Sequence, residues 1–301
     1  MNNNDMKCNQ CPRKCNIDRS IAKGFCGASE KVSLALANLH HSEEPIISGT
    51  KGSGTIFFAG CNLKCVFCQN FEVSNNQIGK EISVERLAEI FKELEDMGAH
   101  NINLVTPTHY ADAIMSALDI YTPNIPIVYN TNGYESVDTI KKLSKYIDIY
   151  LSDFKYYDDT LASRLSHVSN YRDTATLALK EMLRNQPENI IEDGIMKKGV
   201  IVRHLVLPNH TDDSIAVLEH LYSIFGNNIT ISLMSQYVPL NDLSANPDIS
   251  RPLKPIEYKI VLSYLEKLGF DGYMQELSSN TTDYIPTFDC SGVEKKLGNN
   301  S

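Results

Sequence analysis

The sequence lacks the features that direct a chain into a membrane or onto nucleic acid. Residues 1–7 are polar, so they hold neither an apolar signal core nor an amphipathic basic helix. No apolar run approaches the roughly 20 residues that a membrane span needs. No basic block is present, and 28 Lys and Arg residues against 37 Asp and Glu residues give a net charge of −9. We therefore expect a cytoplasmic protein whose partners are neither nucleic acid nor a membrane.

Disulfides are not expected either, because nothing else in the sequence is typical of a secreted chain. The chain has eight cysteines, and seven of them fall into two tight groups, which is typical of metal binding. No internal repeat is visible. With 301 residues, of which 42% are hydrophobic, the chain can bury the core of one barrel-sized domain.

The second cysteine group is the most informative motif. Cys61-Asn-Leu-Lys-Cys65-Val-Phe-Cys68 has the spacing C-x3-C-x2-C and follows the apolar residues 55–60, which read as a buried strand. Three thiolates are one too few for a closed metal site, whereas a four-iron cluster held by three cysteines keeps one iron open to another ligand. The loop would lie at the carboxyl end of a strand, where α/β folds place their active sites.

The first cysteine group predicts a second metal site. Cys8, Cys11, Cys15 and Cys26 supply four thiolates, enough to close a site. Structural zinc and iron–sulfur clusters both use the C-x2-C spacing, so a zinc site and an auxiliary iron–sulfur cluster both remain open. The segment would shield the mouth of the barrel, relay an electron or dock a partner.

After the cysteine loop, strand and helix patterns alternate. Further strands are predicted over residues 101–106, 125–130, 147–152, 200–207 and 229–234. Helices are predicted over residues 83–97, 111–120, 136–146, 212–225 and 255–268, with further helical residues up to 185. Together with residues 55–60 this makes six β/α units, which predict an α/β fold with a parallel sheet. A doubly wound sheet and a barrel both fit the pattern.

The cysteine loop resembles that of the radical S-adenosylmethionine (SAM) enzymes. The family signature is C-x3-C-x-aromatic-C, and here Phe67 is the aromatic residue, followed by Gln69 and Asn70. The resemblance implies two cofactors, a [4Fe-4S] cluster and SAM, whose amino and carboxylate groups bind the open iron. It implies reductive cleavage of SAM to a 5′-deoxyadenosyl radical that abstracts hydrogen from a substrate. It also implies a partial (β/α)6 TIM-like barrel.

Over roughly residues 50–240 the chain resembles the activating enzymes of glycyl radical enzymes, such as pyruvate formate-lyase activating enzymes. This implies a flavodoxin- or ferredoxin-type reductant and a glycyl radical enzyme as the protein substrate. Modification of another peptide or of a small molecule is the alternative function, and a non-catalytic iron–sulfur electron-transfer protein is a third. The formate-lyase activator lacks the four-cysteine segment, which occurs in other relatives of that enzyme.

Two strand ends resemble cofactor-binding segments of these activating enzymes. Asn130, Thr131 and Asn132 match an Asp-Thr-Asn-Gly segment, and Asp153 and Lys155 match an Asp-Leu-Lys segment. The resemblance implies that Asp153 contributes to a monovalent cation site beside SAM and that Lys155 is catalytic. Asn130 stands where the family has an Asp, which removes one charge from the cation site. An ordinary ion pair between Asp153 and Lys155 is the alternative interpretation.

The second strand end departs from the family pattern. Residues 106–109 stand where many radical enzymes carry Gly-Gly-Glu, which holds the amino group of SAM. Thr106 and Thr108 are the expected acceptors for this group. His109 is a catalytic candidate that would face cofactor or substrate, and a structural hydrogen-bonding role is the alternative.

Three further residues complete the predicted site. Arg203 lies in a segment similar to an Arg-Tyr-Val-Val-Val-Pro strand of the activator, so we expect it in the active site, with His204 on the opposite face. Gln236 and Tyr237 follow the sixth strand and would line the adenosine or substrate side. Phe67 would pack near adenine or, alternatively, in the core.

We expect three segments along the chain. Residues 1–48 form the four-cysteine metal-binding segment, residues 49–240 form the radical SAM core, and residues 241–301 form a helix and tail that close the barrel. Cys290 stands alone in this tail, and we interpret it as an ordinary free thiol.

Overall fold

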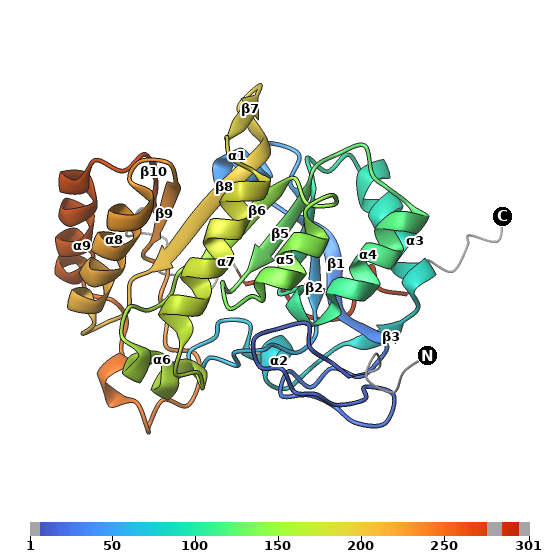
Figure 1. Ribbon diagram of the computed structural model, residues 1–301, viewed down its shortest axis with the longest axis horizontal. Coiled ribbons are helices and arrows are strands. Elements are labelled where there is room, and N and C mark those ends of the chain that lie inside the picture. The colour runs from blue at the N-terminus through green and yellow to red at the C-terminus, as the bar shows by residue number, and fades with distance from the viewer. Residues whose placement is uncertain (1–6, 276–284, 295–301) are drawn as a thin grey trace.

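The computed structural model describes residues 7–275 and 285–294, and its centre is one mostly parallel sheet (Figure 1). The strand order is β10-β9-β8-β6-β5-β4-β2-β1-β3. Six parallel strands follow one another in sequence: β2 (Ser53–Phe58), β4 (Ile102–Val105), β5 (Ile127–Thr131), β6 (Ile149–Asp153), β8 (Ile195–Leu205) and β9 (Thr230–Met234). They confirm the six predicted β/α units and form a partial (β/α)6 barrel.

Helices connect these strands and cover the outer face of the sheet (Figure 1). They are α3 (Val84–Asp96), α4 (Ala111–Ile120), α5 (Val137–Leu143), α6 (Asp159–Ser166), α7 (Tyr171–Asn185), α8 (Thr211–Phe225) and α9 (Pro255–Leu268). Ser83 caps the start of α3, since its hydroxyl accepts a hydrogen bond from the backbone N–H of Arg86 at 3.2 Å. No helix in the described ranges is long and apolar enough to cross a membrane.

Four strands within the described ranges were not predicted. β1 (Val32–His40) pairs antiparallel with β2, β3 (Lys80–Ile82) pairs with β1, and β7 (Ile190–Glu192) pairs with the start of β8. β10 (Gly272–Met274) adds a parallel strand beside β9. The centre of β1 is buried on both faces, and so short an apolar run has no periodicity that identifies it. The division at residue 48 stays a prediction, but β1 from the first segment belongs to the sheet.

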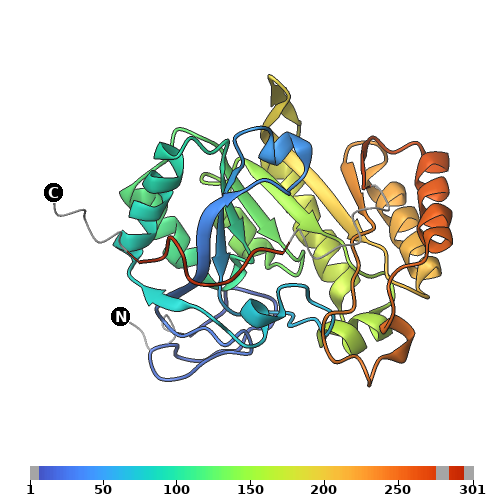
Figure 2. The same ribbon diagram turned by 180° about the vertical axis from the view of Figure 1, so that it is seen from behind.

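The short helix α1 (Pro45–Ser48) lies at the amino ends of the strands (Figure 2). Its Ile47 is fully buried and packs in a cluster with residues of the inner face: Val128, Ile149, Leu151, Met196 and Ile201. The backbone carbonyl of Ile47 also accepts a hydrogen bond from the side chain of Asn101 at 2.8 Å. Because α1 closes this end of the barrel, the interior is reached from the carboxyl ends of the strands.

Residues 285–294 run along β1 on the side seen from behind (Figure 2). The backbone N–H of Cys290 donates to Ala35, and that of Ala37 donates to Ser291. The guanidinium of the buried Arg86 donates to the carbonyl oxygens of Gly292, Val293 and Glu294. The described part of the C-terminal tail is therefore docked on the sheet.

We predict that Gly292→Ala undocks this segment. Gly292 has φ +72°, and a Cβ there would lie 1.9 Å from the carbonyl oxygen of Ala37. Gly98 is the matched control, because it has φ +83° but a Cβ there would meet no other atom within 4 Å. Gly98→Ala should lower the free energy of unfolding only by the cost of holding alanine in the left-handed conformation, about 1–2 kcal/mol. Gly292→Ala should lower it clearly more, as measured by urea unfolding. Equal losses in the two variants would contradict the close docking.

Candidate functional site

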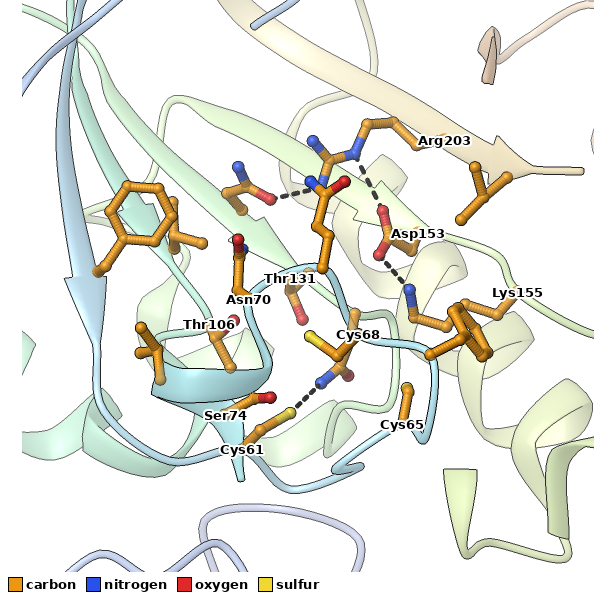
Figure 3. Close-up of a pocket in the computed structure, with 18 of the residues that line it drawn as sticks. Cys61, Cys65, Cys68, Asn70, Ser74, Thr106, Thr131, Asp153, Lys155 and Arg203 are labelled. Carbon is orange, nitrogen blue, oxygen red and sulfur yellow. Dashed lines mark hydrogen bonds and ion pairs between the residues drawn. The ribbon is translucent and has the colours of Figure 1, made fainter. Parts of the chain in front are cut away.

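The loop that carries Cys61, Cys65 and Cys68 begins where β2 ends (Figure 3). Gly60 makes the turn with φ +88°, and a Cβ there would lie 2.3 Å from the carbonyl oxygen of Cys26. Its backbone N–H donates to the carbonyl of Val73 in α2 (Phe71–Ser74) at 2.9 Å. A glycine is therefore required at this turn, which sets the three cysteines at the carboxyl edge of the sheet as predicted.

Hydrogen-bond donors surround the cysteine sulfurs. The side chain of Asn132 donates to the sulfur of Cys61 at 3.4 Å, and the hydroxyl of Ser166 donates to that of Cys65 at 2.9 Å. Burial raises the pKa of Cys65 to about 12, so its thiolate form needs a bound cation.

Donors of this kind stabilise the sulfur ligands of iron–sulfur clusters. Within the described ranges no three His, Cys, Asp or Glu side chains lie close enough together to hold a metal ion as they stand. The donor set of three thiols and the polar groups around them fit an iron–sulfur cluster.

The three cysteines line one side of a pocket at the carboxyl ends of the strands. The pocket holds about 1050 Å³ of space free of protein atoms, including its open mouth, a size on the scale of small-molecule sites. Besides the cysteines, the predicted site residues that line it are Phe67, Thr106, Asn130, Thr131, Asn132, Asp153, Lys155, Arg203, Gln236 and Tyr237. The structure thus brings together residues from six successive strand ends.

A buried ion network lies at the end of β6. The Asp153 carboxylate accepts from Lys155 Nζ at 2.6 Å and from Arg203 Nε at 2.9 Å, with all three side chains at most 16% exposed (Figure 3). Burial alone would raise the pKa of Asp153, but Lys155 and Arg203 outweigh it and hold this pKa below its usual value. The pKa values of Lys155 and Arg203 are raised in turn, because Asp153 outweighs their burial. All three groups are therefore charged at neutral pH.

Sequence reasoning missed Glu43, which belongs to this network. Its carboxylate lies 3.4 Å from Arg203 Nη1 and accepts from the amides of Asn103 at 3.1 Å and Asn130 at 3.3 Å. The oxygen of Asn130 accepts from Arg203 Nη2 at 2.6 Å. An amide can accept from a cation and donate to an anion at once, which a carboxylate cannot, and this explains why Asn rather than Asp suits position 130.

Glu44 is a second acidic residue that was not predicted to belong to the site. Its carboxylate accepts from the hydroxyl of Ser232 at 2.9 Å. Burial raises the pKa of Glu43 and of Glu44, although Arg203 acts in the opposite direction. The Glu43-Glu44 pair before Pro45 is the only sequence signal, and a pair of acids is more often a solvated surface feature.

The residues after β4 divide between pocket and interior. Thr106 lines the pocket and has φ +56°, a left-handed conformation that is strained for a β-branched residue. Thr108 and His109 are fully buried and do not line the pocket. The ring Nε2 of His109 lies 2.8 Å from the carbonyl oxygen of Ala59, and burial lowers its pKa to about 4. The neutral ring therefore supports the residue before Gly60.

The remaining predicted residues lie as follows. Phe67 and Tyr237 form an aromatic pair in the pocket wall, with ring centroids 6.0 Å apart. The side-chain oxygen of Gln236 accepts from the side chain of Gln275 at 2.8 Å. His204 is outside the pocket, with Nδ1 2.7 Å from the carbonyl of Phe154, on the face opposite Arg203 as predicted from strand alternation.

The four-cysteine segment lies against the outer side of the cysteine loop (Figure 1). The backbone N–H of Cys61 donates to the carbonyl of Cys26 at 3.3 Å. The guanidinium of Arg13 donates to the carbonyl of Asn62 at 2.5 Å and to that of His167 at 3.0 Å. A Cβ on Gly24 would lie within 3.6 Å of the sulfurs of both Cys15 and Cys26, so Gly24 lies directly beside these two sulfurs. The metal at this segment stays a prediction.

Comparison with known proteins supports the sequence signature. The family model of the Radical SAM superfamily matches residues 55–221. An uncharacterized protein of Methanocaldococcus jannaschii is 34% identical over 273 residues, which cover 88% of this chain and 75% of that protein.

Two further likenesses are more distant. The pyruvate formate-lyase 1-activating enzyme of Escherichia coli K12 is 28% identical over 169 residues, 52% of this chain and 62% of the enzyme. The crystal structure of a radical SAM methyltransferase from Sphaerobacter thermophilus has a TM-score of 0.50 at 15% identity, over 73% of this chain and 65% of that chain. The chain thus spans less than two thirds of either protein. The structural likeness supports the partial barrel fold alone.

We predict that Asp153→Asn strongly destabilises the protein. It leaves Lys155 and Arg203 buried without their shared carboxylate, and loss of one partner from a buried ion pair costs about 3–5 kcal/mol. Asp96→Asn is the control, because Asp96 pairs with Lys92 on the exposed face of α3. It should show no measurable loss in urea unfolding. If the two variants unfold at the same urea concentration, the ion network is not the stabilising feature described above.

Proposed function

Because the chain belongs to the radical SAM superfamily, we propose that it cleaves SAM reductively at an iron–sulfur cluster bound by Cys61, Cys65 and Cys68. We propose further that it abstracts hydrogen from a substrate in the pocket. The observation that carries this proposal is the set of three cysteines, with no fourth, among the described residues that line the pocket. A cluster held by three cysteines keeps one iron open for SAM, which supplies the radical chemistry when it is bound.

The charges of the pocket suit the methionine part of SAM. Lys155 has three N–H groups, and Asp153 is the acceptor that the described residues supply to them, so two N–H groups remain there to bind a carboxylate. Arg203 is held in place through Asp153 and Asn130. We assign Lys155 and Arg203 to the carboxylate of SAM or to an anionic group of the substrate. The rigid ion network keeps these cations in position, which radical chemistry requires so that the radical forms next to its target.

The aromatic pair of Phe67 and Tyr237 provides a flat apolar wall for adenine. The hydroxyl of Tyr237 donates to the carbonyl of Ile249 at 2.6 Å, which fixes the ring. Gln236 also lines the pocket, and Asn70 lines it from the cysteine loop (Figure 3). These residues would bind the adenosine part of SAM and exclude water from it.

We propose a glycyl radical enzyme as the protein substrate, with a flavodoxin or ferredoxin as the electron donor. The likeness to the Escherichia coli activating enzyme supports this choice. Modification of another peptide or of a small molecule is the second candidate. For the four-cysteine segment we propose one bound metal, zinc or iron–sulfur, which fixes the carbonyl of Cys26 that bonds to Cys61.

Cys65→Ala should reduce 5′-deoxyadenosine formation to background, because two cysteines cannot hold the cluster. The measurement is anaerobic reconstitution with iron and sulfide, reduction in the presence of SAM, and quantification of 5′-deoxyadenosine, iron and zinc. The metal of the four-cysteine segment should remain bound. Cys290→Ala, outside the pocket, is the matched control and should behave as the unmodified protein. Product formation by Cys65→Ala would refute the assigned cluster site.

The substrate proposal has its own test. A peptide that copies a glycyl radical loop, deuterated at the glycine Cα, should transfer deuterium into 5′-deoxyadenosine. The same peptide with alanine at that position is the control and should transfer none. Unlabelled 5′-deoxyadenosine from the deuterated peptide, in an enzyme that cleaves SAM, would favour the second candidate instead.

A further inference from the structure

Glu135 is a buried carboxylate outside both the ion network and the cysteine loop. It lies between β5 and α5 and is 1% exposed. Its Oε1 accepts hydrogen bonds from the hydroxyls of Thr108 and Thr131. Burial raises its pKa to about 7, against the opposing effect of the hydroxyls of Thr108, Thr131 and Tyr129, and no cation from the described part of the chain is among the groups that act on it.

A buried carboxylate without a cation is destabilising, so its position calls for an explanation. Glu135 ties together the residues after two neighbouring strands, since Thr108 follows β4 and Thr131 ends β5. The two strand ends also meet directly, because the backbone N–H of Thr106 donates to the carbonyl of Asn130 at 2.9 Å. Thr106 and Thr131 line the pocket, so Glu135 lies directly behind this part of the pocket wall.

At Thr131 this wall presents an acceptor rather than a donor. The hydroxyl hydrogen of Thr131 is committed to Glu135, and its oxygen accepts from the backbone N–H of Gly133 at 3.3 Å. A hydroxyl has one hydrogen and two lone pairs, so Thr131 has only acceptor capacity left for a ligand. Glu135 in its charged form fixes the direction in which the Thr131 hydroxyl donates, and it adds negative charge behind the wall.

The opposite side of the pocket carries the positive charge. Lys155 and Thr106 lie on different sides of Cys68 in Figure 3. Asp153 is the one carboxylate among the described lining residues, and both of its oxygens are bonded to Lys155 and Arg203. An amino acid ligand has a carboxylate and an amino group, so electrostatic complementarity directs the carboxylate to the cations and the amino group to the threonine wall.

We propose that Glu135 is a positioning residue for the amino group of SAM, acting through the hydroxyl of Thr131. The proposal rests on the proposed function, because it takes SAM as the ligand of the pocket. The residues that follow β4, 106–111, contain no acidic side chain. The proposal therefore takes the negative charge behind this wall from a residue after β5. Glu135 touches Thr131 rather than the ligand itself.

Two substitutions separate the charge of Glu135 from its scaffold role. Glu135→Gln keeps an oxygen that accepts from both threonines but removes the charge, and Glu135→Leu removes both. The probes are SAM and 5′-methylthioadenosine, which has the adenosine part but no amino acid part. Their dissociation constants are measured by anaerobic equilibrium dialysis with cluster-loaded protein. Glu192→Gln, on the exposed hairpin strand β7 at the other end of the barrel, is the matched control.

Glu135→Gln should bind SAM about tenfold more weakly, the scale of one charge-assisted hydrogen bond, and Glu135→Leu at least as weakly, each with unchanged affinity for 5′-methylthioadenosine. Unchanged binding of SAM by Glu135→Gln would overturn the proposal, because the charge would then be irrelevant. Equal losses for both probes would also overturn it, because they would show a general distortion of the pocket. If the unmodified protein with a full cluster fails to bind SAM, the proposed function fails instead.

A second readout needs neither cluster nor SAM. A carboxyl whose pKa is raised by folding contributes stability below its ordinary pKa, and this contribution is lost as the pH rises through about 7. Tyr129 and Tyr150 also interact with Glu135, and burial raises their pKa values far above this range. Cys11 interacts with Glu135 as well and is assigned to the metal of the four-cysteine segment. The midpoint of thermal unfolding of the unmodified protein should therefore fall relative to Glu135→Gln between pH 5 and about 7.5. Parallel profiles would overturn the buried, cation-free state of Glu135.

Discussion

The buried guanidinium of Arg203 is the group on which the rest of the site depends. A charge inside the barrel is tolerated only with matching acceptors, and these come from three parts of the chain: Asp153 on β6, Asn130 on β5 and Glu43 before α1. The position of α1 at the amino end of the barrel places Glu43 within reach of Arg203. Asp153 then also holds Lys155, so the cations of the pocket are fixed before a ligand arrives.

A second constraint joins the four-cysteine segment to the barrel. The close approach of the Cys26 carbonyl to Gly60 leaves no room for a side chain, and the same carbonyl accepts from Cys61. A ligand of one expected metal site is thus hydrogen-bonded to a ligand of the other. Metal binding at the first site would stabilise the loop that forms the second. Arg13 strengthens this contact through the carbonyl of Asn62.

The sequence predicted the six parallel strands because each β/α unit carries local signals, such as the Ser83 cap of α3 and the apolar run before Cys61. It missed β1, whose identity depends on pairing with β2. Asp153 and Arg203 were predicted through family resemblance, and they line the pocket. Glu43 was missed because its contact with Arg203 joins residues 160 positions apart. The sequence could not place His109 behind the cysteine loop, because the burial of His109 depends on how β4 packs against β2. Periodicity and motif spacing describe local structure, whereas these contacts arise only in the folded chain.

The proposed chemistry depends on an iron that three cysteines leave open for the amino acid part of SAM. Electron–nuclear double resonance of the reduced cluster, with SAM carrying 15N at its amino group, tests this most directly. A hyperfine coupling from the label, absent with unlabelled SAM, is the expected result, because the proposed chemistry requires a direct bond between the amino group and the cluster. Bound SAM without such a coupling would contradict the assignment of Cys61, Cys65 and Cys68 as the site of reductive cleavage.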